Sequence, residues 1–454
     1  MVVNNSQGKS IVQIEQDFLK TLDDNSYIDP SLYSKYNIKR GLRNSNGTGV
    51  LVGITNIANV IGYEIKDGVK VPVDGKLFYR GIRLTDLVNG FQKDDRFGFE
   101  ETAFLLLLGK LPTKDALEEF NRVISYNLEF PKFYKEDHII KYPSNNIMNM
   151  LQKQVLTLYT YDKNPEDISL LNTFRQSLSL IAKLPILMAY SYKAKKHYYD
   201  NDSLVLHRPL VNASIAENIL HMLRPDCKFT KEEARLLDLC LVVHAEHGGG
   251  NNSAFATHVV SSTGTDTYSA IATAIGSLKG PKHGGANIMV RAMVNNIMEN
   301  CNWKDYESLS NYIDKILNKE AFNNKGLVYG MGHAVYTKSD PRAVLLKKKA
   351  RELAEIKGFS DKFKLLENIE NLTIEKFKAR KGPEFEICAN VDLYAGLVYE
   401  MLGIEPELYT PIFAVSRIAG WCAHRLEQTR DEKIMRPGYI SISGENEYTN
   451  INNR

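Results

Sequence analysis

Residues 266–297, DTYSAIATAIGSLKGPKHGGANIMVRAMVNNI, contain the pattern that decides the fold. Asp266 is a suitable N-cap for a helix that the pair Gly280-Pro281 would end. Four apolar residues recur at i, i+3, i+4 and i+7 on one face of that helix: Ile271, Ala274, Ile275 and Leu278. The same spacing returns after about Ala286: Val290, Met293, Val294 and Ile297. The stretch therefore predicts two helices joined by a tight turn.

Helix-like patterns of this kind run from about Leu84 to Leu408, without a second cluster of strands. Residues 11–22 predict one short helix before them. Residues 49–80 differ, because they are rich in β-branched residues and contain turn pairs at Asp67-Gly68 and Asp74-Gly75. We therefore predict a mainly α fold with a small N-terminal antiparallel sheet at about 49–80.

Length and composition exclude several classes of protein. The 454 residues exceed the roughly 250–300 at which a single core stops growing, so we expect two domains. A net charge of only +3 gives no support for a nucleic-acid-binding protein. The five cysteines are scattered and form no C-x-x-C pair, which fits a reducing compartment. The N-terminus lacks the apolar run of a signal peptide, so we expect a cytoplasmic protein without a membrane segment.

Five of the ten histidines lie between positions 244 and 333. His244 and His247 are three residues apart and are followed by three glycines. A zinc site is the obvious alternative, but the zincin motif has i, i+4 spacing and a third ligand, and no third ligand is recognisable nearby. We predict no metal site there.

Two glycine-rich loops carry further histidines. His283 lies just before the second helix described above, where the positive end of the helix dipole disfavours imidazolium. The glycines of this loop could equally serve only to let the chain turn between the two helices. In GMGHAVYTKSDPR (330–342), His333 follows two glycines, and Arg342 follows Asp-Pro, whose restricted backbone suits a fork onto a carboxylate. This second loop predicts a ligand site.

Two charged residues fall on helices that should be buried. In NVDLYAGLVYEML (390–402), Asn390 can cap a helix that is apolar nearly all round, and Asp392 lies in its first turn. Asp392 is therefore a candidate buried base or simply a helix-capping acid. Arg417 lies one turn from both Phe413 and Trp421, so it is unlike a solvent-exposed arginine.

These stretches, in this order, resemble the citrate synthase family from about Lys39 to Pro437. The phrases KRGLRNSNGTGVLVG (39–53) and LFYRGI (77–82) are similar to the start of its bacterial members. The resemblance implies a large helical domain of about 1–285 and 400–454 and a small helical domain of about 286–399. It also implies homodimers, with substrates bound between the two domains.

The resemblance further implies condensation of oxaloacetate with an acyl-coenzyme A, the thioester being a co-substrate and no cofactor being permanently bound. His283, His333 and Asp392 would then be catalytic. Four residues would bind oxaloacetate: His247, Arg342, Arg417 and Arg436, the last from the partner subunit. Coenzyme A would contact Val328, Gly330, Gly332 and Asn390. The expected product is citrate, for entry into the tricarboxylic acid cycle.

Three alternatives remain open at this point. A 2-methylcitrate synthase would take propionyl-CoA, and one methylene group in an apolar pocket discriminates by only about 1–3 kcal/mol. A catalytically dead relative would serve as a regulatory or structural dimer, but the retained histidines, aspartate and arginines argue against it. A helical metal-binding protein built on the histidines would contain stoichiometric zinc.

Overall fold

The computed structural model describes residues 9–454 and divides the chain into two compact units, Met1–Ile54 and Thr55–Arg454. The first unit contains three helical elements: α1 (Ile11–Ser26), α2 (Ser31–Lys35) and the 3₁₀ turn η1 (Arg40–Leu42). A capping box between Ser10 and Gln13 begins α1, which explains why the helix starts at Ile11 as expected. The helix continues to Ser26, four residues beyond the predicted end, and none of its residues is buried.

The second unit contains all the strands and the remaining helices of the described residues. The strands are β1 (Ala58–Lys66), β2 (Val69–Tyr79) and β3 (Ile82–Arg83). The helices up to position 261 are α3 (Leu84–Lys93), α4 (Phe99–Leu108), α5 (Lys114–Tyr126), the π-helical η2 (Lys135–Ile140), α6 (Ile147–Tyr159), α7 (Leu170–Asp200), α8 (Ile215–Leu223), α9 (Lys231–His244) and α10 (Asn252–Ser261). The later helices are α11 (Thr267–Lys279), α12 (Ala286–Asn300), α13 (Tyr306–Leu317), α14 (Pro341–Lys357), α15 (Ser360–Lys381), α16 (Val391–Met401), η3 (Pro406–Leu408), α17 (Tyr409–Gln428) and η4 (Ile451–Asn453). This order confirms the predicted mainly α class with a small antiparallel sheet.

The sheet is antiparallel in the order β1-β2-β3. Both Asp67 and Gly68 have positive φ, so the predicted turn between β1 and β2 is confirmed. Two details of the prediction were wrong. Residues 50–55 form no strand, because the sheet begins at Ala58 and offers them no pairing partner. Asp74 and Gly75 form no turn, since both lie within β2.

Gly75 has a different role, which bears on the site. Its amide donates to Ser339 Oγ at 3.0 Å, and a Cβ at this position would clash with the Ser339 carbonyl and the Tyr336 ring. The register of β1 and β2 also shifts beside Gly62, where a Cβ would clash with the Val335 carbonyl. The sheet therefore supports the loop of residues 333–340 through two close backbone approaches.

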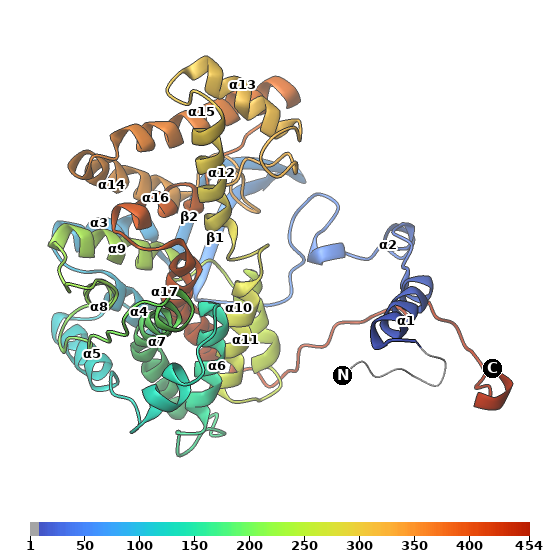
Figure 1. Ribbon diagram of the computed structural model, residues 1–454, viewed down its shortest axis with the longest axis horizontal. Coiled ribbons are helices and arrows are strands. Elements are labelled where there is room, and N and C mark those ends of the chain that lie inside the picture. The colour runs from blue at the N-terminus through green and yellow to red at the C-terminus, as the bar shows by residue number, and fades with distance from the viewer. Residues whose placement is uncertain (1–8) are drawn as a thin grey trace. The chain divides into compact units, whose positions relative to one another are not determined.

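α17 is the central helix of the second unit. Nearly all of its residues are buried, and it packs against α4, α7, α9, α10 and α11 (Figure 1). A buried helix without a polar face must pair its charged side chains internally, so Arg417, His424 and Arg425 need partners inside the protein.

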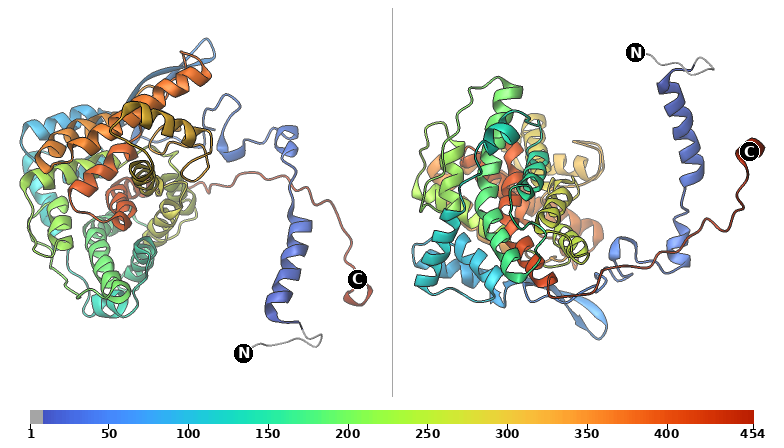
Figure 2. Two further views of the ribbon diagram at one scale, coloured as in Figure 1. Left: turned by 45° about the horizontal axis from the view of Figure 1, so that its top comes forward. Right: turned by 90° about the horizontal axis from the view of Figure 1, so that it is seen from below.

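The helices α12 to α16 form a second group. α16 packs against α12, α14 and α15, and α13 packs against α15 (Figures 1 and 2). Within residues 9–454, no helix combines the length and the apolar composition that crossing a bilayer would require.

Candidate active site

A cavity of about 300 Å³ lies where α12, α14, α16 and α17 meet the end of α9. Eight of the residues predicted from the sequence line it: His247, His283, Gly332, His333, Arg342, Asn390, Asp392 and Arg417. They come from five separate stretches of the chain, so the fold itself brings them together.

His333 is held in one tautomer by the backbone that follows it. Its Nδ1 accepts the amide hydrogens of Val335 at 3.0 Å and Tyr336 at 3.1 Å. The neutral ring therefore carries its proton on Nε2, which lies 3.0 Å from Nε2 of His247. Tyr336 stacks on the ring with centroids 4.7 Å apart. His333 can thus donate a hydrogen bond from Nε2 to a group in the cavity.

The loop before His333 is tied to the start of α16. The Gly332 amide donates to the Cys388 carbonyl at 2.8 Å, and the Asn390 amide donates to the Gly330 carbonyl at 2.9 Å. Asn390 also donates from Nδ2 to the Gly332 carbonyl at 2.9 Å and, through Oδ1, caps α16 at the amide of Asp392. This pairing fixes the distance between His333 and Asp392.

Arg342 begins α14 and is 3% exposed. Its Nε and Nη2 donate to the two oxygens of Asp340 at 3.0 and 2.7 Å. Burial alone would raise the pKa of the Asp340 carboxyl, but the adjacent guanidinium holds it below its usual value. Asp340 is therefore a charged partner that holds Arg342 in one orientation.

Arg417 is 1% exposed and has an incomplete set of partners. Its Nε donates to the His244 carbonyl at 2.6 Å, while Nη1 and Nη2 are buried and find no hydrogen-bond partner among residues 9–454. Burial and the charge of Arg342 lower its pKa to about 10, so the group stays charged at neutral pH. A buried guanidinium with two unpaired donors is costly unless a ligand carboxylate completes it.

His283 faces the cavity as a neutral ring. Burial, followed by the charge of Arg417, lowers its pKa to about 4. Its Nε2 lies 3.0 Å from Ser253 Oγ, which also accepts from Trp421 Nε1 at 3.0 Å. When the Ser253 hydroxyl donates to Nε2, the imidazole proton lies on Nδ1 and can be offered to a ligand.

Asp392 lies in the first turn of α16. Burial raises the pKa of its carboxyl to about 6, and the charge of Asp340 acts in the same direction. Arg342 and Arg417 oppose that rise. The carboxylate is therefore the main form at neutral pH, and it is a stronger base than an exposed aspartate.

Three other predicted residues do not line the cavity. Val328 is buried, and Gly330 contributes its carbonyl to the loop pairing described above. Arg436 is exposed in the segment after α17. Sequence reasoning missed Ser253 and Tyr336 as supports of the two histidines. Ser253 follows HGGGNN closely, and that proximity is the signal that could have indicated it.

A possible metal-binding group lies outside the cavity. Among the described residues, one group of three side chains has ligand atoms within 4.8 Å of one another: His258, His424 and Glu427. None of the three lines the cavity.

Fold and site together define a class of protein: a mainly helical protein whose cavity brings together an aspartate, histidines and a buried guanidinium with two unpaired donors. A family model described as the C-terminal domain of citrate synthase matches residues 46–438. The chain belongs to the citrate synthase family. It is therefore an enzyme, an acyltransferase, and citrate synthesis is the activity that its relatives support best.

The sequence of this chain is similar to those of known relatives over most of their length. The citrate synthase of Synechocystis sp. is 35% identical over 381 residues, which cover 82% of this chain and 86% of that protein. The 2-methylcitrate synthase 2 of Corynebacterium glutamicum is 32% identical over 394 residues, covering 86% and 92%.

Two solved structures are also similar. The citrate synthase of Thermotoga maritima has a TM-score of 0.72 at 30% identity and covers 92% of this chain and 99% of its own. That of Thermoplasma acidophilum, solved as a ternary complex with carboxymethyl coenzyme A and oxaloacetate, has a TM-score of 0.73 at 25% identity and covers 91% and 99%. These likenesses confirm the predicted fold.

Proposed function

We propose that the protein condenses oxaloacetate with acetyl-CoA and water to give citrate and coenzyme A, at the cavity described above. The observation that carries this proposal is the buried Arg417 fork, unpaired on two nitrogens, in one cavity with Asp392, His283 and His333. These groups suit a ligand that carries a carboxylate and a second substrate from which a base can remove a proton.

Arg342, Arg417 and His247 bind oxaloacetate. Arg417 offers Nη1 and Nη2 to one carboxylate, and Arg342 supplies a second positive charge. His333 then donates from Nε2 to the ketone oxygen, which makes the carbonyl carbon more electrophilic.

Asp392 takes a proton from the methyl carbon of acetyl-CoA. That proton is far too weakly acidic for a carboxylate alone, so the developing negative charge on the thioester oxygen must be stabilised. His283 donates a hydrogen bond to this oxygen as a neutral acid. The resulting enolate, held by this hydrogen bond, attacks the ketone carbon of oxaloacetate, and the new alkoxide takes the proton of His333. Water then hydrolyses the citryl thioester, which releases citrate and coenzyme A, and transfer of the proton held by Asp392 back to His333 restores both groups.

For coenzyme A itself, we propose contacts with backbone groups from Val328 to Gly332 and with Asn390. The pairing of residues 330–332 with 388–390 supports this role, because it presents a rigid backbone edge beside Asp392. Residues of about 286–399 act as a small domain that closes on the large one when oxaloacetate binds. The packing of α16 against α12, α14 and α15 supports that division, and the contacts of α14 and α16 with α9 lie between the two proposed domains.

We also propose a cytoplasmic homodimer whose sites are shared. Arg436 is exposed in a segment without helix or strand, which leaves it free to reach a substrate in the partner subunit. The five cysteines are all free thiols, as a reducing cytoplasm allows.

A 2-methylcitrate synthase activity is the second candidate, and the Corynebacterium relative favours keeping it. Coenzyme A release should be measured with acetyl-CoA and propionyl-CoA side by side, each with and without oxaloacetate. The proposal expects oxaloacetate-dependent release with a higher kcat/KM for acetyl-CoA. A higher kcat/KM for propionyl-CoA would make the protein a 2-methylcitrate synthase, and release without oxaloacetate would refute both.

A further inference from the structure

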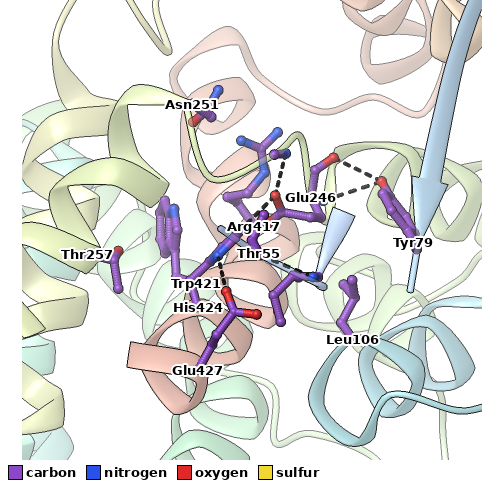
Figure 3. Close-up of polar contacts among 12 residues, drawn as sticks. Thr55, Tyr79, Leu106, Glu246, Asn251, Thr257, Arg417, Trp421, His424 and Glu427 are labelled. Carbon is purple, nitrogen blue, oxygen red and sulfur yellow. Dashed lines mark hydrogen bonds and ion pairs between the residues drawn. The ribbon is translucent and has the colours of Figure 1, made fainter. Parts of the chain in front are cut away.

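The last residue of β2, Tyr79, reaches the end of α9 with its hydroxyl group. Tyr79 is completely buried, and its hydroxyl oxygen lies 3.1 Å from the Val242 carbonyl and 3.1 Å from the Glu246 carbonyl. The Glu246 amide donates to the same oxygen at 3.3 Å, so the hydroxyl faces the backbone of Glu246 (Figure 3). The hydroxyl therefore bridges the last turn of α9 and the residue directly before His247.

The end of α9 depends on side-chain partners, because the last carbonyl groups of a helix find none within the helix. The His244 carbonyl accepts from Nε of Arg417 at 2.6 Å. The Val242 carbonyl accepts from the Ala245 amide at 3.3 Å and from the shorter bond of Tyr79. Val242 is completely buried, so water cannot replace that donor. Loss of the Tyr79 hydroxyl would therefore weaken the pairing of buried backbone groups at this end.

β2 supports both loops that carry the facing histidines of the cavity. Gly75 and Tyr79 are four residues apart in this strand and are buried on the same face. At Gly75 the strand admits the Ser339 carbonyl, in the loop after His333. At Tyr79 it holds the backbone before His247. Because Nε2 of His247 lies 3.0 Å from Nε2 of His333, one strand supports both sides of this contact.

We propose that Tyr79 is a positioning residue for oxaloacetate binding, whose hydroxyl holds the backbone at Glu246 so that the His247 ring stays aligned with His333. Tyr79 is not part of the cavity lining, so it acts through His247 and not on the substrate itself. Burial raises the pKa of the Tyr79 hydroxyl, which therefore keeps its hydrogen throughout the pH range of an assay. The inference rests on the proposed binding of oxaloacetate at His247 and His333.

Tyr79→Phe removes only the hydroxyl group. The Val242 and Glu246 carbonyls then lose a donor, the backbone before His247 relaxes, and the KM for oxaloacetate should rise about tenfold. Both kcat and the KM for acetyl-CoA should change by less than about threefold, because the acid and base groups keep their own supports. Tyr79→4-aminophenylalanine restores a donor at the same place and should return the KM for oxaloacetate to within about threefold of the wild-type value.

Tyr134→Phe is the matched control, because Tyr134 is also completely buried and its hydroxyl donates to a backbone carbonyl, that of Gln154, at 2.9 Å. It should lower the melting temperature as Tyr79→Phe does and leave the KM for oxaloacetate unchanged, since neither Tyr134 nor Gln154 lines the cavity. An equal rise in KM in both variants would overturn the proposal, because lost stability alone would then explain it. An unchanged KM in a folded Tyr79→Phe variant would overturn it as well.

A double-variant cycle with His247→Ala shows whether Tyr79 acts through that histidine. The dissociation constant of oxaloacetate is measured by calorimetry, so that inactive variants can be compared. Tyr79→Phe should raise it about tenfold in the wild-type background and by less than about twofold when the His247 ring is already absent. Equal effects in the two backgrounds would show that Tyr79 does not act through His247, and the proposal would be wrong.

Hydrogen exchange of the wild-type protein tests the same link without any variant that has to fold. The Glu246 amide, which donates to the Tyr79 hydroxyl, should exchange more slowly once oxaloacetate holds His247 in place. Calorimetry first establishes that oxaloacetate binds, so that failure of the proposed function is recognised separately. An unchanged exchange rate at Glu246 with oxaloacetate bound would contradict the positioning role of Tyr79.

Discussion

Replacing Asp392 by asparagine tests the base most sharply, because the two side chains have nearly the same shape. A positioned general base contributes on the order of 10²–10⁴-fold, so kcat should fall by about two to four decades, or about 3–5 kcal/mol of barrier. Oxaloacetate binding should survive, since Arg342 and Arg417 are untouched. Steady-state coenzyme A release and calorimetry with oxaloacetate measure the two effects separately.

The same substitution should stabilise the protein, and the structure gives the size of the effect. Burial raises the pKa of Asp392 from 3.8 to about 6. Folding therefore favours the protonated acid, and above pH 6 the buried carboxylate costs about 3 kcal/mol, at 1.36 kcal/mol per pH unit. Asp392→Asn should raise the melting temperature at pH 8, raise it about half as much at pH 5, and lose most of this effect as the pH falls to 3.8.

The titration of the Asp392 carboxyl should also appear in the pH dependence of wild-type turnover. Turnover should be half-maximal near pH 6 and fall about tenfold per pH unit below it, because only the carboxylate accepts the proton. Near-normal turnover in Asp392→Asn would refute the reasoning and reassign the residue to capping α16. A lower melting temperature of the variant at pH 8 would refute the burial argument alone.

Three further predictions concern closure, sharing and support of the site. Oxaloacetate should tighten acyl-CoA binding in calorimetry, because Arg342 and Arg417 hold one anion between the proposed domains, and equal affinities with and without it would contradict closure. Homodimers of Arg436→Ala and Asp392→Asn should each be nearly inactive, while exchange of their subunits should restore one site per heterodimer; proven exchange without recovered activity would contradict sharing. Gly75→Ala should lower kcat and the melting temperature, because the methyl group displaces the Ser339 carbonyl, whereas Gly68→Ala, in the exposed β-turn, should leave kcat unchanged.

The helical elements could be predicted because their signals are local. Asp266 caps α11 through the Ser269 amide at 2.8 Å, and Asn390 caps α16, as expected from the sequence. The role of Gly75 could not be predicted, because the Asp-Gly pair indicates a turn and the backbone that it must admit lies 264 residues later, at Ser339. Sequence spacing contains no information on such a distant approach.

The candidate site likewise contains residues that the sequence could predict and residues that it could not. His283, His333 and Asp392 stand beside glycines or caps that the sequence displays, and the cavity brings them together. His258 and His424 were not assigned a role from the sequence, because their pairing depends on burial and on a contact across 166 residues. Buried charge pairing is a property of packing, which a single sequence does not report.

The central claim is that this cavity joins acetyl-CoA to oxaloacetate, and product stoichiometry tests it most directly. Purified protein should be incubated with acetyl-CoA carrying a labelled acetyl group and with oxaloacetate, and the products quantified by mass spectrometry. The account predicts one labelled citrate for each coenzyme A released, and neither product when oxaloacetate is omitted. Labelled acetate in place of citrate, or coenzyme A release that is independent of oxaloacetate, would contradict it.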